Sequence, residues 1–114
     1  MKLEQGRIVW AELPSSDGRS RKCRPAVILT RTDQIRAGSP FVAVAITTTF
    51  PDPPPDDHVL LPWHPNGAVR TRLNRPCAAA CSWFVQITES DVMRVGGVVP
   101  PELMRTIVEK ATVT

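Results

Sequence analysis

The stretch Lys22-Cys23-Arg24-Pro25-Ala26-Val27-Ile28-Leu29 joins a cationic segment directly to an apolar one. A continuous apolar run bounded by polar residues and proline predicts a buried strand, here from about residue 24 to residue 30. Pro25 has no N–H to donate to a neighbouring strand, so we expect it at the first residue of the strand or at a sheet edge. Arg24 is therefore expected at the rim of a sheet or barrel, next to a rigid neighbour.

Further strands are predicted on both sides of this stretch. Residues 6–13 alternate, with Ile8 and Trp10 on one side and Val9 and Ala11 on the other. The most apolar strand is predicted over residues 41–47. Shorter or less regular strand patterns follow over residues 58–62, 68–73 and 77–87, and a loop with four prolines separates the first of these from the strand before it.

The end of the chain has a different pattern. At most one short helical turn is expected over residues 88–91, and Gly96-Gly97 is expected to break the chain. Proline suits the first turn of a helix, so a helix is predicted to begin near Pro101. Leu103, Ile107 and Ala111 are spaced four apart and give it one apolar face over about three turns. Short strands followed by one helix predict a mainly β fold: a small, partly open antiparallel barrel with the C-terminal helix packed on it.

The length of 114 residues is that of one domain, which we place over residues 1–114. No stretch approaches the ~20 apolar residues of a membrane span. The first residues lack the apolar core of a signal peptide. Three cysteines without a framework spacing are typical of a reducing compartment. We therefore expect a cytoplasmic protein without membrane association.

The basic residues are concentrated in two places. The formal net charge is only +3, from 14 basic and 11 acidic residues. Seven of the basic residues fall in two windows of six, which hold Arg19, Arg21, Lys22 and Arg24, and Arg70, Arg72 and Arg75. Two such clusters on a small domain predict a patch for a polyanion. A solvated basic surface is the alternative.

The side chains of Cys77, Cys81, His58 and His64 are of the types that bind zinc. Residues four apart on a strand lie more than ~10 Å apart, because a strand rises ~3.3 Å per residue. Cys77 and Cys81 therefore need a turn between them to share one ion. We expect no metal site and no cofactor.

Five short motifs occur in order along nearly the whole chain. They are Gly6-Arg7-Ile8-Val9-Trp10, Arg24-Pro25-Ala26-Val27-Ile28-Leu29, Ala45-Ile46-Thr47-Thr48, Leu73-Asn74-Arg75-Pro76-Cys77, and a closing run from Ile87 through Asp91-Val92 and Gly96 to Leu103 and Ile107. In this order and spacing the chain resembles the MazF/PemK-like toxins of bacterial type II toxin–antitoxin modules.

The resemblance implies an SH3-like barrel that forms a homodimer. It implies sequence-selective, metal-independent endoribonuclease activity on single-stranded RNA, usually mRNA, and inhibition by a cognate antitoxin. The complex with the antitoxin is expected to bind DNA, and the antitoxin to carry an acidic, disordered tail. The family's catalytic arginine and its serine or threonine correspond to Arg24 and Thr47.

Single-stranded RNA is held by basic grooves with aromatic stacking surfaces. We expect the RNA to contact a set of basic, hydroxyl and aromatic side chains: Arg19, Arg21, Lys22, Thr48, Trp63, Arg70, Arg72 and Arg75. Trp10 and Trp83 are instead expected in the core.

The chemistry agrees with these assignments. Metal-free RNA cleavage uses the 2′-hydroxyl of the substrate, and the protein must stabilise extra negative charge on phosphorus. The fork of Arg24 suits that task, and Thr47 supplies a hydroxyl hydrogen bond. The alternatives are a rim salt bridge for Arg24 and an ordinary strand-end threonine for Thr47. His58 and His64 are the only side chains of a type that titrates near neutrality when unperturbed. The family does not rely on a histidine, so no general base is evident.

Two other functions stay open at this point. The first is a catalytically weak or inactive barrel that binds nucleic acid or protein. It is favoured by Arg19-Ser20-Arg21, which stands where the family often has Glu-Gln, and by Val85-Gln86-Ile87, which lacks the arginine of the family's Gln-Ile-Arg segment. The second is an SH3-like adaptor for proline-rich peptides, although three Trp, three Phe and no Tyr make a thin aromatic surface for that role.

Overall fold

The computed structural model describes residues 3–15 and 17–112. Its elements in chain order are β1 (Arg7–Pro14), β2 (Arg21–Ile28), η1 (Thr32–Gln34), β3 (Phe41–Thr47), β4 (His58–Leu60), β5 (Ala78–Ile87), η2 (Glu89–Asp91), β6 (Val92–Val98) and α1 (Pro101–Thr112). The outermost residues of the predicted 1–114 domain and Ser16 of its first turn lie outside the described residues.

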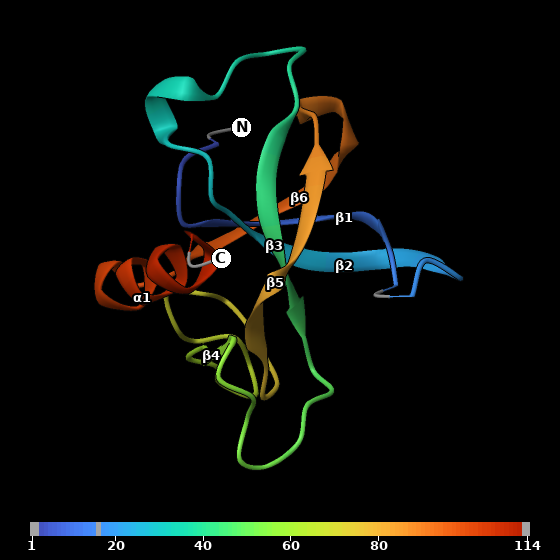
Figure 1. Cartoon of the computed structure of the whole chain (residues 1–114). Coiled ribbons are helices and arrows are strands. Elements are labelled where there is room, and N and C mark those ends of the chain that lie inside the picture. Colours follow the sequence, from blue (N-terminus) through green and yellow to red (C-terminus); the bar gives the residue numbers. More distant parts are fainter. Residues whose placement is uncertain (1–2, 16, 113–114) are drawn as a thin grey trace.

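The six strands form one antiparallel sheet in the order β4-β5-β3-β2-β1-β6. The sheet is strongly bent, so that β1 and β2 run across β3 and β5 (Figure 1). This is the mainly β, SH3-like barrel with a C-terminal helix and short helical turns that the sequence predicts. The 3₁₀ turn η1 lies in the connection from β2 to β3, and η2 lies in the connection from β5 to β6.

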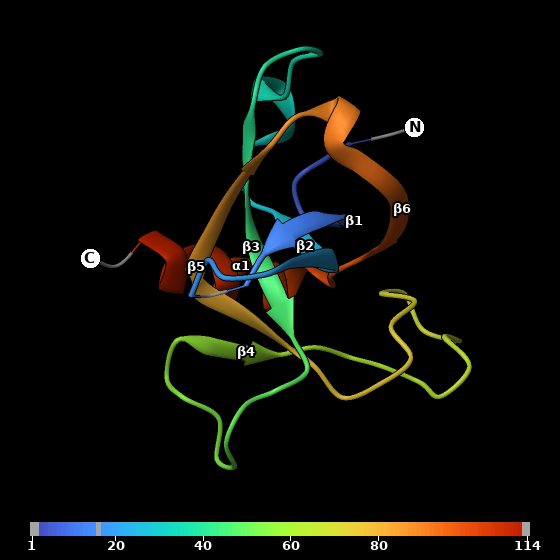
Figure 2. The ribbon, with the colours of Figure 1, turned by 90° about the vertical axis from the view of Figure 1, so that its right-hand side faces the viewer.

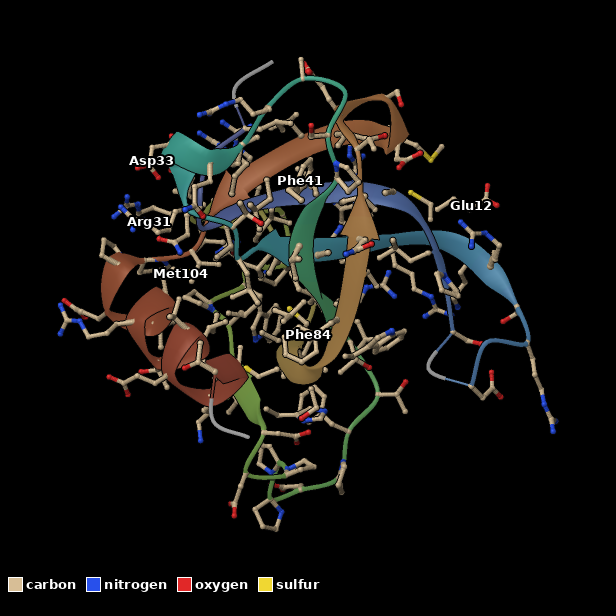
Figure 3. All side chains as sticks on the ribbon, turned by 45° about the horizontal axis from the view of Figure 1, so that its top comes forward. Glu12, Arg31, Asp33, Phe41, Phe84 and Met104 are labelled. Atoms are coloured by element: carbon tan, nitrogen blue, oxygen red, sulfur yellow. The ribbon has the colours of Figure 1, made fainter. Side chains whose placement is uncertain are left out.

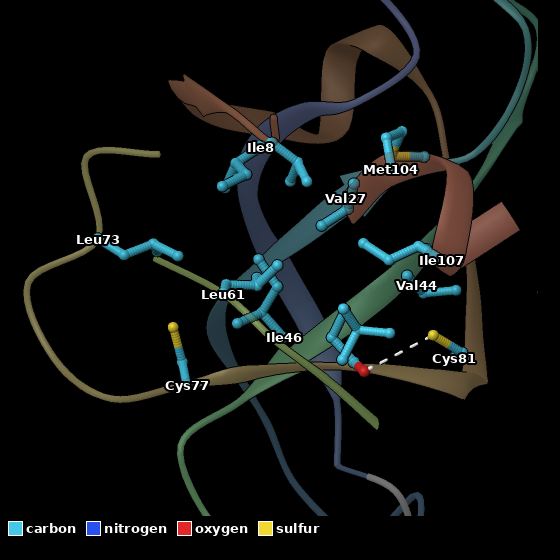
Figure 4. Packing of buried hydrophobic residues seen from close by; sticks show 13 residues of the cluster. Ile8, Val27, Val44, Ile46, Leu61, Leu73, Cys77, Cys81, Met104 and Ile107 are labelled. Carbon is cyan, nitrogen blue, oxygen red and sulfur yellow. Dashed lines mark hydrogen bonds between the residues drawn. The ribbon is translucent and has the colours of Figure 1, made fainter. Parts of the chain in front are cut away.

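The second half of β2 and nearly all of β3 are apolar because both faces of the sheet are covered there. Val27 pairs with Val44 and both face a core cluster that includes Ile8 and Ile107 (Figure 4). The alternate residues, among them Ile28, face a second cluster on the other side. A strand buried on both faces reads as a continuous apolar run, which explains the pattern of residues 26–29 and 41–46. On the outer half of β5, Phe84 points away from the sheet and is half exposed (Figure 3).

Helix α1 closes one side of the first cluster. Met104 and Ile107 are buried in it, and Leu103, Val108 and Ala111 pack against it. The predicted apolar face is therefore the one that the helix buries. No helix among residues 3–15 and 17–112 is long and apolar enough to cross a membrane.

Two predicted features are wrong. Gly96-Gly97 does not break the chain but lies inside strand β6, which pairs with β1. A Cβ at Gly97 would overlap the Arg70 carbonyl oxygen, so glycine is needed there because residues 70 and 71 approach closely. Residues 68–73 are turns rather than a strand, and the carbonyl of Arg70 accepts the N–H of Val98 at 2.9 Å.

Strand β2 begins at Arg21, three residues before the predicted start. It pairs with β1 over residues 21–27 but with β3 only over residues 26–28. Pro25 lies opposite Trp10 of β1, and its other edge faces no strand. The missing N–H of Pro25 therefore costs no ladder bond, and the expectation of an edge position is confirmed. Arg24 lies on the same open edge.

Candidate active site

A cavity of about 390 Å³ opens where this edge of β2 faces the end of β3. It is lined by residues of β1, β2, β3 and β6 and of the loop before β5: Trp10, Lys22, Cys23, Arg24, Pro25, Ile46, Thr47, Thr48, Thr49, Arg72, Leu73, Asn74, Arg75, Cys77 and Arg94. The cavity exists because β2 and β3 pair only over residues 26–28 of β2 and are apart before residue 26, so that their side chains do not fill the space between them.

Arg24 is the most constrained cation at this cavity. Its guanidinium carbon lies 5.6 Å from the centre of the Trp83 ring, within the range of a cation–π contact. Its Nε is buried and has no hydrogen-bond partner. No carboxylate in the described part of the chain forms an ion pair with it. The rim salt bridge is thus not observed, and the donors of Arg24 are left available to an anion.

Thr47 ends β3 at the wall of the same cavity. Its hydroxyl oxygen accepts the N–H of Thr49 at 3.0 Å and donates to the Thr49 carbonyl at 3.1 Å. A threonine that bonds two residues onward closes a local turn and stops the strand. The turn fixes the hydroxyl at the cavity wall and also brings Thr48 and Thr49 to it.

Cations dominate the lining of the cavity. Besides Arg24 it holds Lys22, Arg72, Arg75 and Arg94, and no acidic side chain of the described residues lines it. Arg72 has φ of 60°, which is uncommon for a residue with a Cβ. Several like charges around one concave surface raise the local concentration of an anionic ligand.

Arg94 and Trp10 line the cavity but were not predicted as site residues. Arg94 of β6 places its guanidinium carbon 4.6 Å from the centre of the Trp10 ring. Trp10 was expected in the core but is half-buried and lines the cavity. A missed strand explains the first omission, because Arg94 reaches the cavity only through the pairing of β6 with Trp10. Trp83 does pack against the second core cluster, as expected, while its ring also meets Arg24.

Not all of the predicted RNA contacts meet at this cavity. Lys22, Thr48, Arg72 and Arg75 line it, together with Arg24 and Thr47. Four others lie outside its lining: Arg19, Arg21, Trp63 and Arg70. Of these, Arg21 donates to the Glu12 carbonyl at 3.0 Å on the exposed start of β2.

The cysteines and histidines do not gather into a metal site. No group of three His, Cys, Asp or Glu side chains within residues 3–15 and 17–112 is placed to hold an ion. Cys23 is exposed, whereas Cys77 and Cys81 are buried. Burial raises the pKa of the Cys77 thiol to about 11, so this lining residue stays protonated near neutrality.

Comparisons with known proteins agree with this architecture. MazF (Form-I) from Deinococcus radiodurans has a TM-score of 0.74 at 15% identity over 97% of this chain and 94% of the other. The Mycobacterium tuberculosis toxin MazF-mt6 has a TM-score of 0.65 at 25% identity over 92% and 90%. An endoribonuclease from Mycobacterial species has a TM-score of 0.66 at 16% identity over 97% and 88%.

Structures of MazE-MazF from Deinococcus radiodurans are also similar, and for Form-II the TM-score is 0.69 at 14% identity over 97% of this chain and 92% of the other. Among curated proteins no sequence matches. Residues 4–113 match the family model described as the PemK-like, MazF-like toxin of type II toxin–antitoxin systems. Because this match covers nearly the whole chain, the protein belongs to the PemK/MazF-like toxin family.

Proposed function

We infer that the protein is the toxin of a type II toxin–antitoxin module and cleaves single-stranded RNA at selected sequences without a metal ion. The observation that carries the proposal is the cavity at the open edge of β2, where Arg24 and Thr47 meet among four further cations. Membership of the toxin family and the similarity to an endoribonuclease support it.

The proposed reaction begins with the 2′-hydroxyl of the RNA. Its oxygen attacks the adjacent phosphorus, the P–O5′ bond breaks, and the products are a 2′,3′-cyclic phosphate and a 5′-hydroxyl. The guanidinium of Arg24 stabilises the charge that builds on the phosphoryl oxygens and donates a proton toward the leaving oxygen. An arginine side chain keeps its positive charge, so Arg24 is assigned to charge stabilisation and not to the role of free general base. No histidine or carboxylate of the described residues lines this cavity, so the proton of the 2′-hydroxyl passes to water.

Thr47 has a smaller part in this proposal. The N–H of Thr49 holds its hydroxyl oxygen in place, so the O–H only has to rotate away from the Thr49 carbonyl to donate to a phosphate oxygen. Lys22, Arg72, Arg75 and Arg94 hold the neighbouring phosphates and make binding dependent on salt.

An antitoxin partner is part of the same proposal, since structures of MazE-MazF are among the similar ones. An acidic antitoxin segment is complementary to the five cations that line the cavity. A homodimer and DNA binding through the antitoxin complex stay predictions from the family resemblance, and a cytoplasmic location stays a prediction from the sequence composition.

The test is a cleavage assay on long single-stranded RNA in excess EDTA. We expect discrete cuts, and fragment ends that carry a 2′,3′-cyclic phosphate and a 5′-hydroxyl. An oligonucleotide that contains a cut site but has 2′-deoxyribose on the 5′ side of the scissile phosphate is the control and should stay intact. Cleavage of this control, or cleavage only when a metal ion is added, would contradict the proposal. No cleavage of varied RNAs would favour the non-catalytic binding module.

A further inference from the structure

A second cavity, of about 280 Å³, lies beside the candidate active site and shares Thr47 and Thr49 with it. Its other lining residues come from the start of β4 and from β5: Asp57, His58, Ala80, Ser82 and Trp83. The chemistry proposed for Arg24 uses none of these five side chains.

The strand register explains why the cavity is there. Strand β5 pairs with β3 on one side, with Thr47 opposite Ala78, and with β4 on the other, with His58 opposite Ala80. Figure 2 shows β4 beside the first half of β5, below the end of β3. Paired residues and residues two apart share a face, so Thr47 and His58 lie on one face, about 12 Å apart across two strand spacings and a two-residue offset. The alanines between them are too small to fill that space.

The polar groups in this cavity are held in a fixed arrangement. His58 Nδ1 lies 2.8 Å from Asp57 Oδ1. An ionised carboxylate only accepts hydrogen bonds, so Nδ1 carries the proton and donates it. Hydrogen bonding with His58, and to a smaller extent with the Ser82 side chain, lowers the pKa of Asp57. Since a carboxylate offers about four acceptor positions, an oriented and ionised Asp57 still has positions left for a ligand.

The cavity also has an aromatic wall that connects it to the active site. The ring of Trp83 lines it, and the same ring carries the guanidinium of Arg24 at 5.6 Å. Its volume lies just below the ~300–1,000 Å³ typical of pockets for drug-sized ligands, and is suited to one flat ring system rather than to a larger molecule.

We propose that this cavity binds one nucleobase of the RNA next to the scissile phosphate and selects a base with an exocyclic amino group. Bases of single-stranded RNA are recognised by stacking on aromatic side chains and by hydrogen bonds to their edges. A carboxylate accepts from an amino group such as N4 of cytosine. At the same ring position uracil has the carbonyl oxygen O4 instead of an amino group, and the carboxylate of Asp57 repels it. The proposal rests on the proposed function, because it assumes that RNA lies across Arg24 and Thr47.

The experiment measures binding without cleavage. Fluorescence anisotropy at fixed salt gives the affinity of the full chain for two labelled dodecamers, oligo(C) and oligo(U), both with 2′-O-methyl groups that block the nucleophile. We expect the wild-type protein to bind oligo(C) on the order of tenfold more tightly, which is the size of one good contact to a base edge. Asp57→Asn, whose amide also donates, should lose most of this preference.

Asp56→Asn is the matched control, because it makes the same change of charge one residue away. Asp56 is exposed and lines neither cavity. Lys110 Nζ donates to its backbone carbonyl, which the substitution leaves in place. The preference for oligo(C) should survive in this variant. Ser82→Ala keeps the carboxylate but removes the polar side chain that lines the cavity with Asp57, so we expect about a threefold loss of preference. That variant decides the question if Asp57→Asn does not fold.

The outcomes separate this proposal from the proposed function. Equal binding of oligo(C) and oligo(U) by the wild-type protein overturns the nucleobase pocket, and so does an unchanged preference in Asp57→Asn. Cleavage of ordinary RNA is followed in parallel. If the protein discriminates the bases but never cleaves RNA, the proposed endoribonuclease activity is contradicted and the nucleobase pocket is supported. If it cleaves RNA but does not discriminate the bases, the nucleobase pocket is contradicted and the endoribonuclease activity is supported.

Discussion

Both halves of β2 are extended, but the first half is largely exposed and the second half is buried. Residues 26–28 pair with β3 on one edge, residues 26 and 27 also pair with β1 on the other, and the side chains of all three are fully buried. Residues 21–25 pair with β1 alone, and Arg21, Lys22 and Cys23 are exposed. The boundary lies at Arg24 and Pro25, both half-buried.

This difference shows how a small barrel can hold a cation at an anion site. The buried half fixes the position of the strand through packing on both faces of the sheet. The other half continues that rigid strand into a region where one edge is open, so Arg24 is positioned without an ion pair that would occupy its donors. A site built on a strand is held more closely than one on a loop.

The largest expected effect on stability comes from the buried half. Ile28→Ala leaves a cavity in the second core cluster and should lower the free energy of unfolding by about 2–5 kcal/mol. Cys23→Ala, in the exposed half of the same strand, should stay within about 0.5 kcal/mol. Urea unfolding followed by circular dichroism measures both. Equal losses in the two variants would break the distinction between the halves.

A smaller effect is expected where β3 faces the open half. Thr47→Val keeps the shape of the side chain but removes the hydroxyl, and a lost hydrogen bond to a charged group costs about 1.5–3 kcal/mol. We expect the single-turnover rate of RNA cleavage to fall about 10- to 100-fold. Thr47→Ser, which keeps the hydroxyl, should recover most of the rate. A Thr47→Val rate equal to that of the wild type would reduce Thr47 to a residue that ends the strand.

Arg94 tests whether the cavity wall extends to β6. Arg94→Gln removes one cation and its contact with Trp10, so RNA binding should weaken about three- to tenfold at moderate salt. The slope of log affinity against log salt should also fall by about 0.7, the value for one phosphate contact on a single strand. Arg105→Gln on α1 is the control for net charge. If the slope of log affinity against log salt is the same for Arg94→Gln and Arg105→Gln, Arg94 does not belong to the RNA site.

The smallest effect is a difference in reactivity between two cavity residues. Because the pKa of Cys77 is raised to about 11, only about one in a thousand of its thiols is ionised at pH 8. Iodoacetamide at pH 8 should therefore modify the exposed Cys23 and spare Cys77, which mass spectrometry of the peptides resolves. Above pH 10 the labelling of Cys77 should begin to rise. Rapid labelling of Cys77 at pH 8 would show that the cavity opens more widely than the structure indicates.

Much of the fold could be predicted because local pattern and tertiary environment agree. Apolar runs bounded by proline and glycine mark β1, β2, β3 and β5, and the four-residue spacing from Leu103 marks the buried face of α1. The assignment of Arg24 and Thr47 to one catalytic site was based on the family resemblance rather than on their spacing in the sequence. The structure brings both to one cavity, and their catalytic roles stay predictions.

The remainder depends on contacts between distant segments. Strand β6 was missed because Gly96 and Gly97 are typical of breaks, whereas here they let Ile8 and the 70–71 turn approach closely. Residues 68–73 alternate like a strand, but Arg72 has a positive φ and the segment turns. The second cavity follows from the register of three strands, which no local pattern in the alanine-rich start of β5 encodes.

The central claim is that Arg24 stabilises the transition state of RNA cleavage from the open edge of β2. Its most direct test is the single-turnover rate of Arg24→Ala in excess EDTA, with the folded fraction of the same sample measured by urea unfolding. We predict a rate on the order of 10²–10³-fold below wild type, with the fold intact. A rate within a few-fold of wild type, or a loss of rate explained by unfolding, would contradict the claim.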